Sequence, residues 1–170
     1  MMRFINFTTH LILRCMKKLV LIFTFAVCLT AFVDAQDYRT GIGLRAGPYY
    51  GLTVKHFTGS KTALEGLLTR WSGIDITVLY EIHYRLFDVN RLNWYFGLGG
   101  HIGFWEGSHL NNGTAGTNYT IIGLDGILGL EYNFSEVPVN ISVDWKPAFN
   151  IIGYSEFWPL GGAFSIRYVF

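Results

Sequence analysis

Strict alternation of apolar and polar side chains runs through residues 139–150, VNISVDWKPAFN. The polar positions of this stretch include Asp144 and Lys146. The intervening positions are bulky and apolar: Val139, Ile141, Val143, Trp145, Pro147 and Phe149. A period of two is typical of a β-strand, whose successive side chains point to opposite faces. The stretch therefore predicts a strand with one apolar and one polar face.

The same alternation recurs along the chain, and no segment after the first 35 residues has a sustained helical period. Turn compositions such as TGSK, FDVN and SEVP separate the alternating segments. Residues 41–57 are also compatible with one bent strand in place of two. Eight strands are predicted, over residues 41–47, 50–57, 62–71, 73–85, 92–105, 120–134, 139–150 and 160–170.

Residues 1–35 are typical of a secretory signal peptide. From Met16 onward, two lysines precede an apolar run of about 15 residues, and small side chains occupy Val33 and Ala35 at the cleavage positions. The apolar run is short of the roughly 20 residues that a membrane-spanning helix needs. We expect translation to start at Met16 and export to leave one β-barrel domain over residues 36–170.

The charge of this domain excludes one class of function. Four of the 13 basic and one of the 12 acidic residues lie in the leader, so the domain has nine basic and eleven acidic residues, a formal net charge of −2. Nucleic-acid binding calls for a basic patch, so no nucleic-acid partner is expected. Both cysteines, Cys15 and Cys28, also lie in the leader, and no disulfide framework is expected in the domain.

Two all-β arrangements fit the alternation, and the size of the apolar face distinguishes them. In a soluble sandwich or barrel the apolar face forms the core. In a transmembrane barrel the apolar face meets lipid and the polar face fills the lumen. The interior of an eight-stranded barrel is only just wide enough for side chains. The apolar face is too bulky for such a lumen, since it includes Trp94, Phe96, Phe104, Tyr132, Phe134, Trp145, Phe149, Phe164, Tyr168 and Phe170.

The polar face carries nearly balanced charges, which a lumen requires because a buried charge must be paired. His83 and His101 lie on the same face and are interpreted as lumen filling rather than as metal ligands. We therefore expect a filled lumen and no wide pore. The predicted lumenal charge network consists of Arg45, Lys55, Glu65, Asp75, Glu81, Arg85, Asp125, Glu131, Asp144, Lys146 and Arg167.

The last strand ends in aromatic residues at two-residue steps, with Tyr168 and Phe170 as the final pair. Together with the strand rhythm and the stretches GLEYNF, ISVDWKPAFN and GGAFSIRYVF, this end resembles small Gram-negative outer-membrane β-barrel proteins of the OmpA/OmpX type, among them a family of unassigned function. The resemblance implies an all-β, eight-stranded antiparallel up-and-down transmembrane β-barrel in outer-membrane lipid. It also implies insertion by the barrel-assembly machinery, which would read Tyr168 and Phe170.

We expect the protein to have a structural role or an interaction role through the loops near 106–118 and 150–159, with an unknown loop partner. No catalytic, cofactor-binding or metal-binding residue is predicted. Glu106, Ser108 and His109 share one loop, which does not fix the geometry of a catalytic triad. The stretch GLGGHIG lies inside a strand with no following helix, so it does not support a dinucleotide site. A lipid-modifying enzyme, a narrow channel and a soluble periplasmic ligand-binding barrel remain alternatives.

Tryptophans near predicted strand ends are interpreted as interfacial girdles, because such rings favour the boundary between membrane and water. They are Trp71, Trp94, Trp105 and Trp158.

Overall fold

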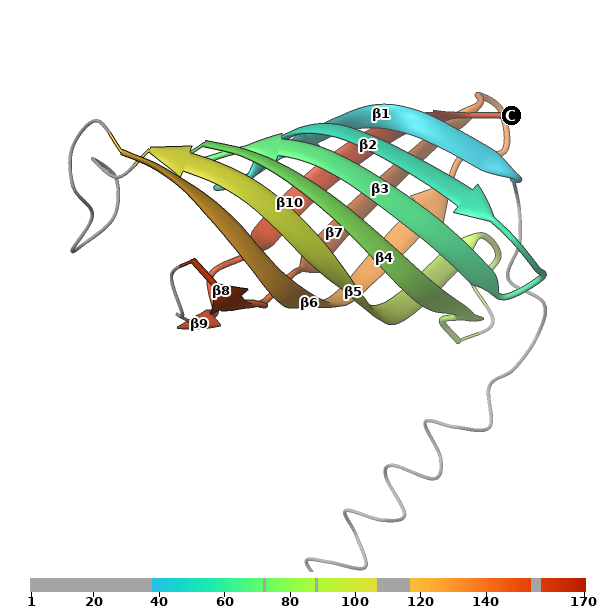
Figure 1. Ribbon diagram of the computed structural model, residues 1–170. Coiled ribbons are helices and arrows are strands. Elements are labelled where there is room, and N and C mark those ends of the chain that lie inside the picture. Colours follow the sequence, from blue (N-terminus) through green and yellow to red (C-terminus); the bar gives the residue numbers. More distant parts are fainter. Residues whose placement is uncertain (1–37, 72, 88, 107–116, 154–156) are drawn as a thin grey trace, which may run out of the picture. The chain divides into compact units, whose positions relative to one another are not determined.

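A computed structural model describes residues 38–71, 73–87, 89–106, 117–153 and 157–170. The described residues form a closed all-β barrel, in which no helix is long and apolar enough to cross a membrane. Figure 1 shows its tilted strands wrapping around one axis. The strands are β1 (Thr40–Ala46), β2 (Tyr50–Phe57), β3 (Thr62–Arg70), β4 (Gly73–Arg85), β5 (Leu92–Glu106), β6 (Asn118–Asn133), β7 (Val139–Trp145), β8 (Ala148–Ile152), β9 (Phe157–Trp158) and β10 (Gly162–Val169).

Ten strands make an eight-stranded wall because two wall strands are interrupted. Both β7 and β8 pair with β6, so they form one wall strand with a break at Pro147. Proline has no N–H to donate, which interrupts a ladder inside a sheet. Its carbonyl still accepts a hydrogen bond from the N–H of Gly126 at 2.9 Å, so the wall stays closed there. In the same way, β9 pairs with β8 and β10 pairs with β7.

Every wall strand pairs antiparallel with its neighbour in the chain, and β1 pairs with β10 to close the barrel. At the closure, Thr40 and Phe170 exchange backbone hydrogen bonds of 2.9 and 2.8 Å. If the residue pairings are followed from β1 once around the barrel, they return to β1 about ten residues further along the strand. This stagger tilts the strands relative to the barrel axis. The predicted eight-stranded antiparallel up-and-down barrel is confirmed.

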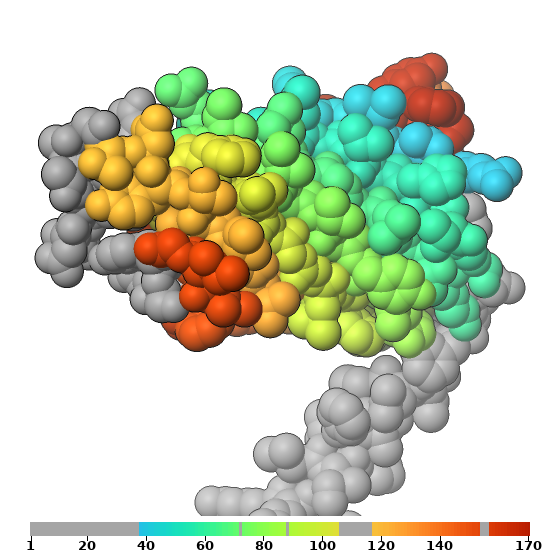
Figure 2. Space-filling model, in the orientation of Figure 1, coloured from blue at the N-terminus to red at the C-terminus, as the bar shows by residue number. Residues whose placement is uncertain are grey.

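Inward and outward side chains alternate along every long strand. On β4 the residues Ile74, Ile76, Val78 and Tyr80 point outward and are 46–55% exposed, whereas the residues between them are buried. Figure 2 shows the outer surface that β2 to β6 present. The polar face is therefore the inside of this barrel.

Near residues 41–57 the structure agrees with the predicted pair of strands, whereas near residues 150–159 it differs from the prediction. Residues 41–57 form two strands, because the segment 47–49 reverses the chain between β1 and β2. Residues 150–152 and 157–158 were expected to belong to a loop, but they lie in strands, because β8 pairs with β6 and β9 pairs with β8.

Large apolar side chains share the interior with the charges. Leu67, Leu79, Tyr95 and Ile127 form a buried cluster within the barrel. A second cluster at the end that carries Thr40 and Phe170 contains Tyr38, Phe57 and Ala63. A third cluster at the opposite end contains Trp105 and Ile121. The interior is thus a mixed core that contains apolar clusters as well as charged side chains.

Trp105 does not belong to the interfacial girdle, so its predicted position was wrong. Its side chain is only 2% exposed and donates a hydrogen bond of 2.9 Å to Asp75 inside the barrel. Trp158 packs beside it with ring centroids 5.9 Å apart, whereas Trp71, at 49% exposure, lies on the outside as predicted. The reason is strand parity, because residue 105 shares the inward face of β5 with His101 and Gly103.

Candidate functional site

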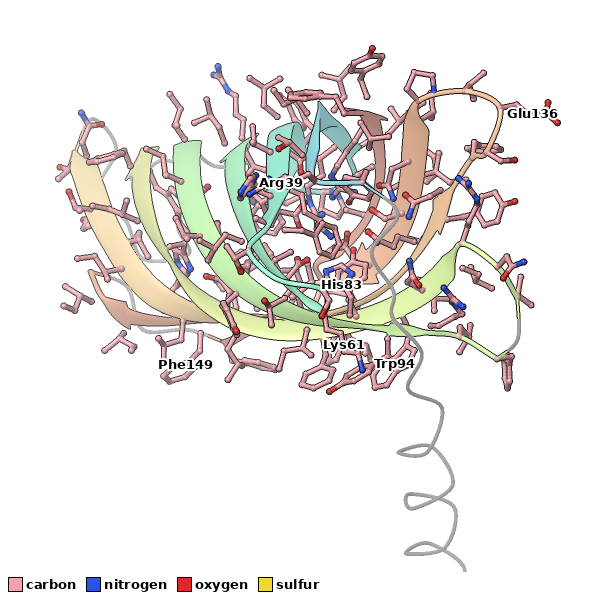
Figure 3. The ribbon with its side chains drawn as sticks, turned by 90° about the vertical axis from the view of Figure 1, so that its right-hand side faces the viewer. Arg39, Lys61, His83, Trp94, Glu136 and Phe149 are labelled. Carbon is pink, nitrogen blue, oxygen red and sulfur yellow. The ribbon has the colours of Figure 1, made fainter. Side chains whose placement is uncertain are left out.

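Ten of the eleven residues of the predicted lumenal network are buried inside the barrel, each at most 4% exposed. Arg85 differs, because it lies at the end of β4 and is only half-buried. Figure 3 looks toward the end that carries Thr40 and shows His83 among the interior side chains, with Trp94 and Phe149 on the outside. Alternation along the strands thus brings charges from distant parts of the chain into one interior.

Lys55 is the centre of the first ion cluster. Its Nζ lies 2.8 Å from a carboxylate oxygen of Glu81, 3.5 Å from one of Glu131 and 3.7 Å from one of Glu65. It also lies 3.9 Å from the centre of the Tyr95 ring, a distance typical of a cation–π contact. The positive charge of this ammonium group, together with that of neighbouring basic side chains, therefore balances the negative charges of three acidic side chains.

His83 and Arg167 complete this cluster. The two ring nitrogens of His83 lie 3.0 Å from Glu81 and 3.3 Å from Glu131. Arg167 forms an ion pair with Glu65 across the barrel. Its remaining N–H groups donate to hydroxyl and amide oxygens of Thr53, Asn140 and Ser142, at 2.8–3.0 Å. A guanidinium group has five donors, and this arrangement uses most of them.

A second ion pair joins Arg45 on β1 to Asp144 on β7. Both side chains are fully buried, and two N–H groups of Arg45 donate to the two carboxylate oxygens at 2.8 and 2.5 Å. Tyr95 donates a third hydrogen bond to the same carboxylate at 3.2 Å. Such bidentate geometry is among the stronger charge-assisted arrangements in proteins.

The third cluster lies toward the end of the barrel at which β5 ends and β6 begins. Lys146 forms an ion pair with Asp125, whose other oxygen lies 2.7 Å from Nδ1 of His101. The opposite ring nitrogen of His101 lies 3.0 Å from the amide oxygen of Asn150. Tyr49 in the β1–β2 turn faces Lys146 at 5.5 Å. Burial raises the pKa of Tyr49, and the nearby acidic side chains raise it further, so this hydroxyl stays protonated.

A small cavity of about 10 Å³ adjoins this third cluster, which is room for about one water molecule. Asp75, Thr77 and Asn150 line it, and one side-chain atom of each, Oδ2, Oγ1 and Nδ2 respectively, has no hydrogen-bond partner among the described residues. Small-molecule sites usually occupy about 300–1,000 Å³. The cavity therefore suits a single bridging water and not a substrate.

The interior of the barrel is filled by side chains that ion pairs hold together. Among the described residues, no group of three or more His, Cys, Asp and Glu side chains is placed to hold a metal ion. The loop residues Ser108 and His109 lie outside the described residues, and so do most of the loop region 106–118 and residues 154–156 of the loop region 150–159. The side chain of Glu106 does so as well.

Several interior residues were missing from the sequence-based list. Tyr95, Asn140 and Asn150 lie at inward positions of their strands, so parity alone could have placed them inside. Tyr38 precedes β1, and no strand pattern could have shown that its hydroxyl lies 3.4 Å from Glu131.

Comparison of the chain with protein-family models, curated proteins and solved structures finds no match in any of the three.

Proposed function

We propose that this protein is an integral outer-membrane β-barrel with a structural or loop-mediated role. The observation that carries the proposal is the distribution of polarity in the closed barrel, which is the reverse of that in a water-soluble protein. Large apolar side chains cover the outside at 40–76% exposure, whereas ten charged side chains of the network are buried inside. Soluble monomers rarely expose contiguous apolar patches larger than a few hundred Å². A closed barrel also satisfies its backbone hydrogen bonds, as lipid requires.

Sequence features agree with this location. The predicted signal peptide would deliver the chain out of the cytoplasm, and the aromatic terminal strand resembles the segment that the barrel-assembly machinery reads. Tyr168 and Phe170 both face outward, at 60% and 64% exposure, with ring centroids 6.2 Å apart. Both side chains are thus accessible for recognition during insertion.

The filled interior supports a role other than wide-pore transport. Opening a path along the axis would require Lys55, Arg167 and Arg45 to leave their buried carboxylate partners. Removing one partner of a buried pair is costly, about 3–5 kcal/mol. The barrel therefore acts as a rigid membrane anchor, and we assign interaction with a partner to its loops.

Gel mobility after cell fractionation tests the location first. We expect the protein in the detergent-extracted outer-membrane fraction, migrating differently on SDS gels before and after boiling, because a closed barrel resists SDS at room temperature. A periplasmic soluble protein prepared in parallel is the control for contamination. Recovery in the soluble periplasmic fraction with no mobility shift would contradict the proposal and make the exposed apolar rows the surface of another assembly.

A charge on the outer surface tests lipid contact directly. Val78 lies midway along β4 and is 55% exposed. Val78→Arg should lower the free energy of unfolding from a bilayer by about 2–4 kcal/mol if this position lies near the membrane midplane. The measurement is urea unfolding in lipid vesicles, with Val78→Leu as the matched control. A loss below about 0.5 kcal/mol, typical of a water-exposed site, would contradict the lipid-facing assignment.

A further inference from the structure

An apolar groove of about 490 Å³ lies on the outer surface of β5, β6 and β7. Trp94 on β5 and Trp145 on β7 line it, and the aliphatic side chains of Leu128, Leu130 and Val143 also line it. The pairing registers place Leu130 between Trp94 and Val143 and pair Leu128 with Trp145, so the groove crosses β6 between β5 and β7. Its volume lies within the range of small-molecule sites.

One end of the groove reaches the turn between β4 and β5, because Leu86 also lines it. The N–H of Leu86 donates to the carbonyl of Leu92 at 2.8 Å, which places Leu86 beside the start of β5. Arg91 immediately precedes Leu92, and its Nη1 donates to the carbonyl of Phe134 at 3.3 Å. Arg91 does not line the groove, but its guanidinium group lies at the same end of the barrel as Leu86.

Aromatic side chains surround the same end of the groove. The rings of Tyr84, Trp94 and Phe96 stack pairwise, with centroids 5.3–6.1 Å apart. Tyr132 and Phe134 pack edge to face on β6 and just beyond it, at 5.1 Å. Aromatic rings concentrate at the level of lipid headgroups in membrane proteins. This end of the groove thus has the composition of an interfacial region, with apolar surface extending from it toward mid-barrel.

Charge at this end of the barrel favours an anionic ligand. Among the described residues of the rim, Arg39, Lys61 and Arg91 are basic and Glu136 is acidic, and the sequence adds one acidic residue outside the described ones, Asp88. Figure 3 labels Arg39, Lys61 and Glu136 at this end. Basic side chains at a membrane surface attract anionic headgroups, and a guanidinium fork matches the oxygens of a phosphate.

We propose that the groove binds one acyl chain of an anionic glycerophospholipid, with the lipid phosphate at Arg91. This inference rests on the proposed membrane location. The occupant is a lipid because the groove is apolar over its length and opens on the outer surface of the wall. It is anionic because the cation lies at the interfacial end, where a headgroup would be.

Quenching of tryptophan fluorescence by brominated lipid tests the proposal, since two of the five tryptophans line the groove. The exported chain is reconstituted into phosphatidylcholine vesicles that contain either brominated phosphatidylglycerol or brominated phosphatidylcholine at the same mole fraction. We expect about a fivefold preference for the anionic lipid at the quenchable site. Trp94→Phe should reduce the quenching, which places the bound chain in the groove.

Arg91→Gln should abolish this preference, whereas Arg70→Gln, a matched change near the opposite end of the barrel, should preserve it. Equal quenching by both lipids, or a preference that survives Arg91→Gln, would overturn the lipid site. The mobility shift on SDS gels is recorded from the same vesicles. A shifted, inserted barrel without lipid preference overturns the site alone, whereas a barrel that fails to insert overturns the membrane location and the site together.

Discussion

Replacing Asp144 by leucine is expected to lower the free energy of unfolding by about 3–5 kcal/mol, because it leaves the fully buried Arg45 without its counter-charge. The change also removes the acceptor of the Tyr95 hydroxyl. An unpaired charge in a closed interior has no water to compensate it. The measurement is urea unfolding of the barrel in lipid vesicles, followed by tryptophan fluorescence. The variant and the unchanged protein are compared with the same dependence of the free energy of unfolding on urea concentration.

A double variant distinguishes the stability lost with the ion pair from the stability lost with side-chain packing. Arg45→Leu combined with Asp144→Leu should recover much of the stability, since replacing both partners of a buried ion pair by apolar groups is often nearly neutral. Val143→Ala, at the adjacent outward position with 59% exposure, is the matched control and should cost much less. If Asp144→Leu behaves like that control, Asp144 does not face the interior and the assignment of the two faces is wrong.

Lys55→Met should have an effect of similar size, about 3–5 kcal/mol, for a related reason. The ammonium group of Lys55 lies within 3.7 Å of three buried carboxylates, those of Glu65, Glu81 and Glu131. Methionine nearly keeps the shape of the side chain but removes its charge, so the carboxylates repel one another at close range. Unfolding of the variant in lipid vesicles at neutral pH measures the loss.

Neutralising the nearest carboxylate provides the control for Lys55→Met. Glu81 lies closest to the ammonium group, and Glu81→Gln in the same chain should restore part of the lost stability. Lys61→Met, which alters a lysine at the rim, should change stability far less. A variant of Lys55 no less stable than the Lys61 variant would contradict the central role assigned to this cluster.

Strand alternation was enough to predict which face of each strand is polar, and the barrel places those polar faces inside. Arg45, Glu65 and Asp144 all lie at positions where the period of two predicts an inward side chain. The partners could not be predicted in this way. Glu65 pairs with Arg167, which is 102 residues away in the sequence, and that contact depends on the stagger of the whole barrel.

Trp105 shows where a rule based on composition alone fails. A tryptophan near a strand end is typical of a membrane girdle, but its parity on β5 directs this ring inward to Asp75. Tyr95 also lies at an inward position, although its size favours an outward assignment by composition. In both cases the direction of the side chain follows from its position in the strand and not from the residue type.

The sequence by itself determined the all-β class, the number of wall strands and the polarity of each face, because these depend on local periodicity and on turn composition. Only the tertiary structure decided which charges meet, which aromatic rings enter the interior and where Arg91 stands relative to the apolar groove. These contacts join residues from different strands. Their geometry depends on register and stagger, which become defined only when β1 closes against β10.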